Sequence, residues 1–237
     1  MALTMSALGC KTYHKVNTHV DRIRIDDQLE EVDEEMVEMI QPYKVELEEE
    51  MSRVLCYNSQ MLEKGKPEST LTNWFSDLLM DVAREEFDVN LSFAVQNYGG
   101  IRRSSLPKGQ VTVGLVYELM PFDNELVVLK MSGGEVQRFC DRLAGSGGWP
   151  VSRELRFTIE ADQAVNVTVN DKPLDVEGEY YMVINDYAAN GGDGLEWLRP
   201  LPRIRSGLLI RDGMIDHLEM TDTIRPVLLD GRITIEQ

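Results

Sequence analysis

The sequence predicts an α+β domain, with helices layered over a mixed sheet, and three observations support this class. Helical apolar stripes and strand-length apolar runs both occur along the 237 residues. They follow one another without the strict strand–helix–strand rhythm of a parallel α/β sheet. Hydrophobic residues make up 43% of the chain, which at this length is enough to bury a core.

The N-terminal part predicts a linker followed by acidic helices. Residues 11–26 show no periodicity, and Asp26 or Asp27 would then cap a helix. Pro42 should break or kink that helix, and a second helical piece is expected at residues 47–55. The first piece carries an apolar stripe at spacings of three and four: Leu29, Val32, Met36, Met39, Ile40 and Tyr43.

The next part predicts a central helix. Residues 64–68 form a turn, and Thr70 or Thr72 is expected to cap the helix that follows. Its broad apolar face predicts packing against the rest of the core: Leu71, Trp74, Phe75, Leu78, Leu79, Val82 and Phe87.

The remaining chain alternates strands with a further helix. A helix is expected at residues 136–143, and Asn170 with Asp171 predicts a turn. Apolar runs of strand length predict the strands: residues 91–95, 126–130, 155–159, 165–169 and 180–184.

Charge and hydropathy exclude two classes of partner. The formal net charge is −17, so the chain should repel nucleic acid and anionic membrane surfaces. Much of the acidic excess lies between Asp26 and Glu50, and a solvated helix face explains it. No apolar run reaches the roughly 18 residues of a membrane-spanning helix.

A polar, glycine-containing stretch follows the strand expected at residues 91–95. Adjacent Gly99 and Gly100 allow positive φ and let a ligand approach the backbone. Asn97 offers an amide, and Arg102 offers a planar guanidinium suited to phosphate or hydroxyl oxygens. The stretch suggests a polar small-molecule site at a strand end, although these residues alone favour a plain turn with a solvated arginine.

Two more stretches of this kind occur at residues 120–124 and 185–194. In order and spacing, the three resemble the signature of the substrate-binding C-terminal domain of the 5'-nucleotidase family, which includes UDP-sugar hydrolases. The resemblance implies a layered α/β/β/α-type domain with mixed sheets. It extends from about residue 63, so we expect a signal-like N-terminus and linker at residues 1–25, an acidic helical segment at 26–62 and the domain at 63–237.

The resemblance also implies roles for single residues. The rings of Phe122 and Tyr187 would hold a nucleobase between them, although the family commonly has Phe at the second position. Asp193 would accept hydrogen bonds from the ribose hydroxyls, and Asn97 would bond the base. From the residues alone, Phe122 could instead fill the core, and the carboxylate of Asp193 could bond its own turn.

Further implied contacts include departures from the family pattern. Arg102 would reach the ribose and phosphate, beside the backbone of Gly99 and Gly100. Pro67 stands where the family has a ligand-binding arginine, and Lys66 offers a point charge next to it. Residues 151–153 stand where a glycine-containing strand lines the base pocket in the family, so that wall is expected to differ.

No catalytic or metal-ligating residue is predicted. His14, His19 and His217 are scattered, and no nucleophile motif or P-loop occurs. In the resembled family, two metals in a separate N-terminal domain clamp the attacking and leaving oxygens. We therefore expect the chain to bind the base and ribose of a nucleotide or nucleoside, while divalent metals belong to a separate metallophosphoesterase chain.

This function has two alternatives. One is a non-catalytic, surface-tethered binder of nucleotides or nucleosides. The other is a structural relic whose pocket no longer binds a nucleotide. The departures from the family pattern at Pro67 and residues 151–153 are consistent with this alternative.

Residues 1–10 are small and apolar, and they resemble the tail of a bacterial lipoprotein signal that ends at Gly9 and Cys10. The basic start of such a signal is missing. We hypothesise that Cys10 is lipidated, which would place the protein in the periplasm or cell envelope and confine membrane contact to this lipid. An ordinary N-terminus with a stray thiol is the alternative.

Overall fold

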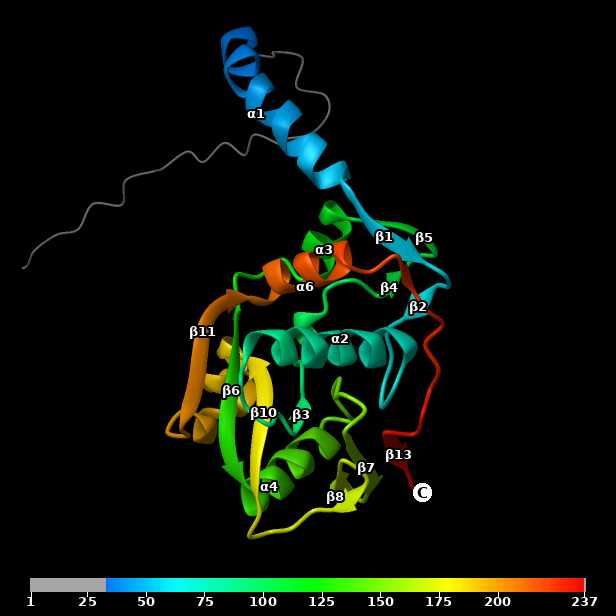
Figure 1. The fold of residues 1–237 in the computed structure, drawn as a ribbon, viewed down its shortest axis with the longest axis vertical. Helices are drawn as coiled ribbons and strands as arrows, with labels where there is room; N and C mark the ends of the chain where they lie inside the picture. The colour runs from blue at the N-terminus through cyan, green and yellow to red at the C-terminus, as the bar shows by residue number, and fades with distance from the viewer. Residues whose placement is uncertain (1–32, 237) are drawn as a thin grey trace, which may run out of the picture. The chain divides into compact units, whose positions relative to one another are not determined.

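The computed structural model describes residues 33–236 (Figure 1). The chain divides into two units between Lys44 and Val45, and the second of them, Val45–Gln237, contains the sheets. The helix α1, Glu34–Ser52, has Asp33 before its first turn, and the Asp33 carboxylate accepts a hydrogen bond from Met36 N at 3.1 Å. The predicted caps Asp26 and Asp27 lie outside the described residues. Pro42 lies inside α1 rather than ending it, because a proline removes only one intrahelical hydrogen bond.

The prediction that helical structure continues through Val54 and Leu55 is wrong. The helix ends at Ser52, and residues Val54–Asn58 form strand β1. β1 pairs on one side with β5, Gly109–Thr112, and on the other with β12, Thr223–Ile224. The strand is fixed by partners far away in the sequence, so the local helical spacing does not decide its structure.

The central helix forms as predicted, but with a different cap. α2 spans Thr70–Glu86, and Ser69 is its N-cap. Ser69 and Thr72 form a capping box, in which each side chain bonds the other's backbone N–H. Thr72 is therefore the third residue of the helix, at position N3, rather than the cap. Leu71, Phe75 and Leu79 on the apolar face are fully buried.

The central sheet has four strands, of which β6, Glu125–Ser132, is buried on both faces and β11, Arg203–Leu209, is largely exposed. Their order is β11; β6; β10, Glu179–Asn185; and β3, Phe93–Ala94. Along β6, Leu126 and Val128 belong to the core cluster that includes α2, whereas Val127 and Leu129 belong to a second cluster on the other face. A strand with both faces buried reads as a continuous apolar run, which is why the sequence predicts it clearly.

Two smaller sheets and one strand pair complete the domain. One sheet has the order β12-β1-β5. The other comprises β13, Ile233–Ile235; β7, Leu155–Glu160; β8, Gln163–Val169; and β9, Lys172–Pro173. β2, Leu62–Glu63, pairs with β4, Ser105–Leu106. All three sheets contain both parallel and antiparallel pairs, so the predicted α+β class with mixed sheets is confirmed.

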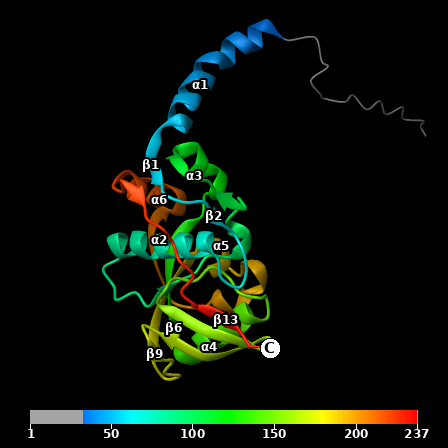
Figure 2. The same cartoon turned by 90° about the vertical axis from the view of Figure 1, so that its right-hand side faces the viewer.

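Short helices connect the strands. They are α3, Val113–Leu119; α4, Gly133–Ala144; α5, Asp186–Ala189; and α6, Ile210–Glu219. The described residues also form three 3₁₀ turns: η1, Tyr98–Gly100; η2, Gly192–Gly194; and η3, Glu196–Leu198. The predicted turn at Asn170 and Asp171 joins β8 to β9, and both residues have positive φ. After β12 the chain crosses α2 and reaches β13, as Figure 2 shows.

The strand directions bring the three polar stretches to one edge of the central sheet. β3 and β10 are parallel, so their carboxyl ends lie at the same edge. β6 runs antiparallel to β10, and Asn185 at the end of β10 pairs with Leu126 at the start of β6. The segments after β3, before β6 and after β10 therefore meet there, although about 90 residues separate the first from the last.

Candidate functional site

A cavity of about 630 Å³ lies where the three stretches meet. Its lining residues are Asn97, Gly99, Gly100, Arg102, Pro121, Phe122, Asp123, Asn124, Tyr187 and Asp193. All seven residues that the sequence singles out for substrate binding are among them. Their roles toward a ligand stay predictions, but their convergence is a property of the fold.

Asn97 and Asp193 form the polar floor of this cavity. The Asn97 amide donates to the Asp193 carboxylate at 2.8 Å. The side-chain oxygen of Asn97 accepts a hydrogen bond from the Asn185 side-chain amide at 3.0 Å. The same amide also donates to the side-chain oxygen of Gln96 at 3.0 Å. Asn97 is 7% exposed, and both Asn185 and Gln96 are buried, so the amide network fixes how Asn97 is oriented.

Left-handed backbone positions shape the loop that carries Asp193. Gly191 has φ 95° and Asp193 has φ 55°, a conformation that Asp adopts more easily than most residues. Arg142 donates to the Asp193 carbonyl oxygen at 2.8 Å. The Asp193 carboxylate bonds Asn97 and the Tyr187 hydroxyl, the latter at 3.3 Å, so it faces the cavity rather than its own turn.

Two aromatic rings flank the cavity and remain accessible. Phe122 is 37% exposed and Tyr187 is 49% exposed, whereas Phe75 and Phe139 in the core are fully buried. Phe122 therefore does not fill the core. The Tyr187 ring rests on Gly192, where any Cβ would overlap it. Arg102 lies with its guanidinium carbon 5.7 Å from the centre of the Phe122 ring.

Gly99 and Gly100 differ in what they contribute. Neither uses the positive φ that glycine allows, because the chain forms the 3₁₀ turn η1 here. A Cβ on Gly100 would overlap the side-chain amide of Gln96 and lie 2.6 Å from the side-chain oxygen of Asn97. A Cβ on Gly99 would meet nothing closer than 3.9 Å. Gly100 is thus required for close packing, while Gly99 faces open space.

Arg211 anchors the loop that carries Phe122, and the sequence does not single it out. Its side chain donates to the Asp123 carboxylate at 2.5 Å and to the Phe122 carbonyl oxygen at 3.4 Å. It also lies 4.2 Å over the Tyr117 ring and is 8% exposed. Asp186 ties the same loop to α5 by accepting from the Asn124 amide at 3.0 Å and from Glu125 N at 3.1 Å.

Four cations form a rim beside the cavity, and two of them, Lys64 and Arg142, give no signal in the sequence. Lys64 lies 4.0 Å and Lys66 4.7 Å over the Tyr98 ring. Burial lowers the pKa of Lys64, and the charges of Arg102 and Lys66 lower it further. Burial and Arg142 likewise lower the pKa of Lys66. We call Lys64, Lys66, Arg102 and Arg142 the cationic rim.

Residues 151–153 do not line the cavity. Val151 forms an isolated bridge with Val95, and the Ser152 hydroxyl accepts from Ala94 N at 2.9 Å. Both side chains are buried. Residues 151 and 152 therefore contact the strand segment at Ala94 and Val95, and they form no wall of this cavity.

The described residues offer neither a metal centre nor an activated thiol. No group of three or more His, Cys, Asp or Glu side chains in residues 33–236 could hold a metal ion. Burial raises the pKa of the Cys56 thiol to about 11 and that of Cys140 further, which disfavours the thiolate form. No helix in the same residues is long and apolar enough to cross a bilayer.

Comparison with known proteins identifies the family. The model of the family "5'-nucleotidase, C-terminal domain" matches residues 51–200. A 5'-nucleotidase of Vibrio parahaemolyticus is 25% identical over 209 residues, covering 86% of this chain and 37% of the relative. The UshA protein of Salmonella pullorum is 32% identical over 106 residues, covering 43% of this chain and 19% of the relative.

The fold agrees with this match. The crystal structure of a 5'-nucleotidase precursor from Thermus thermophilus superposes with a TM-score of 0.72 at 30% identity, covering 86% of this chain and 43% of that one. The site and fold thus define a substrate-binding type of domain, and the chain belongs to the 5'-nucleotidase C-terminal domain family. It spans less than half the length of these relatives, and the two-metal centre expected of the family has no counterpart among the described residues.

Proposed function

We propose that this chain binds the base and ribose of a nucleotide or nucleoside in the cavity built by Asn97, Phe122, Tyr187 and Asp193. The observation that carries the proposal is the convergence of two exposed aromatic rings with a carboxylate and an amide in one cavity. Ring stacking on a base contributes about 1–3 kcal/mol and accepts any base. A carboxylate that faces a cavity can accept two hydrogen bonds from vicinal hydroxyls.

The cationic rim supports a nucleotide as well as a nucleoside. Arg102 lines the cavity, and Lys64 is close enough for the Arg102 charge to lower its pKa. A phosphate at the cavity edge would relieve the mutual repulsion of these cations. Lys66 takes part in this rim, so a cation is present near Pro67 even though the arginine expected from the family is absent.

We further propose that a metallophosphoesterase module on a separate polypeptide supplies the metals for hydrolysis. This rests on the two-metal centre expected of the family, for which residues 33–236 offer no group of metal-ligating side chains. In that arrangement this chain holds and orients the nucleoside, while bond cleavage takes place on the partner's metals. The alternative is a binder that presents or stores nucleotides without cleavage.

The experiment measures phosphate release from AMP. The chain with Mn²⁺ or Zn²⁺ alone should release none, and a mixture with a metallophosphoesterase polypeptide from the same source should release phosphate. Asp193→Asn should lower that rate. Phosphate release that is unaffected by Asp193→Asn would contradict a role of this cavity in the reaction, and binding without any acceleration in the mixture would favour the alternative.

A location in the periplasm or cell envelope, through a lipid on Cys10, is also a proposal. Cys10 lies outside the described residues. Mass spectrometry of the protein from the native membrane fraction tests it, because a diacylglyceryl group adds a defined mass to the cysteine. A free Cys10 thiol in that fraction would contradict the proposal.

A further inference from the structure

A second cavity, of about 700 Å³, lies between α2 and the segment that leads from α6 to β13. It shares no lining residue with the cavity described above. Figures 1 and 2 both show this C-terminal segment passing alongside α2 before it reaches β13. The proposed nucleotide function makes no use of this cavity.

One wall of this second cavity is apolar. Trp74 and Leu78 from α2 meet Leu218 from α6 and Ile224 from β12. These side chains are between 1% and 8% exposed, so most of each side chain is packed in the core and only a small part of it faces the cavity. A wall that combines an indole with branched aliphatic groups suits a flat or branched apolar body.

The carboxylates that line this cavity are already paired. Asp77 and Asp230 hold the buried Arg232 at 2.9 Å and 2.8 Å. Asp81 pairs with Arg84 at 3.0 Å. Arg232 in turn bonds backbone and carboxylate oxygens with all its nitrogens, so it has no donor left for a ligand.

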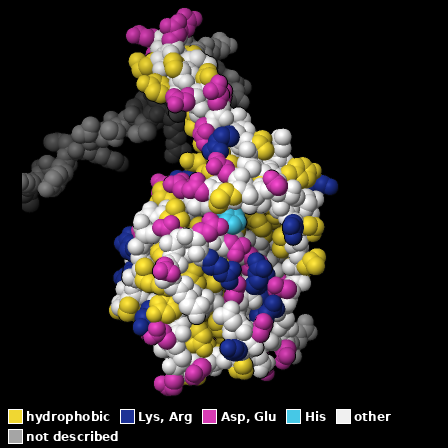
Figure 3. Space-filling model, viewed as in Figure 1, with side chains coloured by type: hydrophobic (Ala, Val, Ile, Leu, Met, Phe, Trp, Pro, Cys, Tyr) yellow, Lys and Arg dark blue, Asp and Glu magenta, His cyan; other side chains and the backbone are white. Residues whose placement is uncertain are grey.

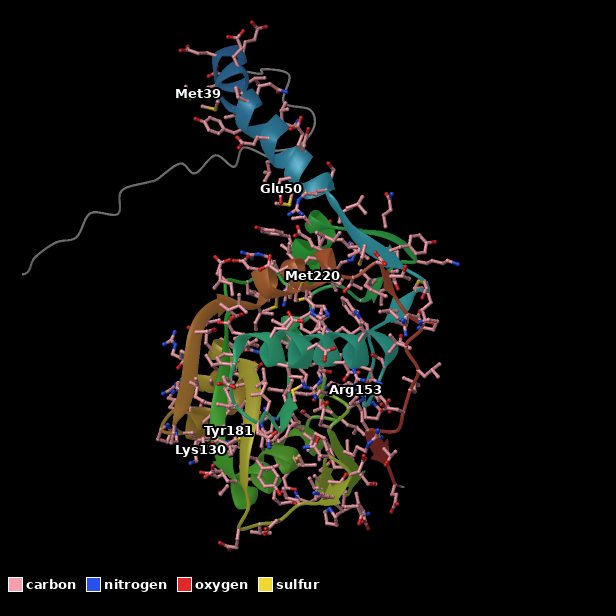
Figure 4. The ribbon with its side chains drawn as sticks, in the orientation of Figure 1. Met39, Glu50, Lys130, Arg153, Tyr181 and Met220 are labelled. Atoms are coloured by element: carbon pink, nitrogen blue, oxygen red, sulfur yellow. The ribbon has the colours of Figure 1, made fainter. Side chains whose placement is uncertain are left out.

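Two further arginines, Arg153 and Arg225, line the cavity and are exposed. No hydrogen bond or ion pair joins the exposed Arg225 side chain to another residue in the described range 33–236. The Arg153 side chain is 55% exposed and forms an ion pair with Asp77 at 3.6 Å, and the Asp77 oxygens also bond Arg232. Arg153 is labelled in Figure 4, below α2. Figure 3 shows Lys and Arg side chains gathered among Asp and Glu side chains in the middle of the face viewed there.

We propose that this cavity is a second binding site, for a small organic anion with an aromatic or branched apolar body. The body would rest on Trp74 and Leu78, and the anionic group would take hydrogen bonds from Arg225 and Arg153. Charge-assisted bonds of this kind are among the stronger polar contacts in proteins. Arg225 has no partner in residues 33–236, and Arg153 shares Asp77 with Arg232, so both guanidinium groups keep donors for an anion.

The test uses phenyl phosphate, which carries a flat ring and one anionic group, and observes the indole N–H signals by NMR. The chain has three tryptophans, and they report different places. Trp74 lines the second cavity, and Trp149 lines a smaller hollow beside Asp193 and the cationic rim. Titration should shift the Trp74 signal saturably, both in the wild type and in Asp193→Asn.

Variants then test the arginines. The double variant Arg153→Ala, Arg225→Ala should weaken the Trp74 response about tenfold or more, which corresponds to loss of charge-assisted hydrogen bonds. The control Lys108→Ala, Lys172→Ala removes the same charge from exposed lysines outside the cavity and should leave the response unchanged. Benzyl alcohol, which lacks the charge, should bind more weakly than phenyl phosphate.

Three outcomes would overturn the proposal: no saturable Trp74 shift at millimolar phenyl phosphate, equal affinity in the double arginine variant, or equal binding of benzyl alcohol. A shift confined to Trp149 would assign the probe to the smaller hollow beside the cationic rim and contradict the second site. The experiment therefore tests the second site independently of the proposed nucleotide binding, and either proposal can be contradicted while the other stands.

Discussion

The Asn97 amide donates to the Asp193 carboxylate at 2.8 Å, although 96 positions separate the two residues. This bond joins the segment after β3 to the loop after β10 across the floor of the cavity. The second donor to this carboxylate is the Tyr187 hydroxyl at 3.3 Å. The carboxylate is thus held in one orientation by neutral donors, which keeps its charge available to ligand hydroxyls.

Replacing Asp193 with Asn should weaken binding of adenosine and AMP about 10- to 100-fold, because two charge-assisted hydrogen bonds are lost. Asn adopts the left-handed backbone of this position as readily as Asp, so the thermal midpoint of unfolding should change little. Calorimetric titration measures the affinity, and a thermal scan provides the control. An unchanged affinity would remove Asp193 from the ribose site.

Replacing Phe122 with Ala should weaken base binding by about 1–3 kcal/mol, the range of one stacked base. Tyr187→Phe keeps the ring and loses only the bond to Asp193, so it should bind almost as well as the wild type. Met220→Ala truncates another side chain, 71% exposed, that does not line the cavity and should have no effect. If Phe122→Ala and Met220→Ala behave alike in titrations with adenosine, Phe122 does not stack on the base.

The two neighbouring glycines provide a matched pair of variants. Gly100→Ala should lower the free energy of unfolding by about 1–3 kcal/mol, because the added Cβ meets the buried amides of Gln96 and Asn97. Gly99→Ala should be close to neutral, since its Cβ would lie in ordinary contact with Asn97 at 3.9 Å. Chemical denaturation of both variants checks the difference. Equal losses of unfolding free energy in the two variants would contradict this prediction, because they would show that the side chains of Gln96 and Asn97 shift to accommodate the added methyl group.

The cationic rim predicts a pH dependence that separates AMP from adenosine. The pKa values of Lys64 and Lys66 are lowered, so each carries its charge below that pKa and loses it above. AMP affinity should therefore begin to fall at a pH below the ordinary lysine pKa of about 10.4. Adenosine affinity should stay level over the same range, and Lys64→Gln, Lys66→Gln should flatten the AMP profile. Parallel profiles for the two ligands would contradict phosphate binding at the rim.

The sequence predicts the three polar stretches because each combines glycines, amides or charges directly after or before an apolar run. The resemblance of these patterns to the 5'-nucleotidase family then singles out Asn97, Phe122 and Asp193. The fold then adds their meeting at one edge, which depends on β3 and β10 being parallel and β6 antiparallel. Strand direction is a tertiary property, and no local pattern in the chain specifies it.

Other parts of the site could not be predicted for the same reason. Arg211 lies at the start of α6, and Lys64 lies next to β2, in segments without motif character. Their contacts with Asp123 and Tyr98 join positions far apart in the chain. The error at Val54 has a similar cause, since helical spacing extends by chance into a strand that pairs with β5 and β12.

The most direct test of the account is calorimetric titration of the chain with adenosine, with Asp193→Asn and Phe122→Ala measured alongside. We expect saturable one-to-one binding in the wild type and weaker binding in both variants, because the cavity lies within the unit Val45–Gln237. Absence of binding to the wild type, both alone and with a metallophosphoesterase polypeptide present, would contradict a working nucleoside site in this chain.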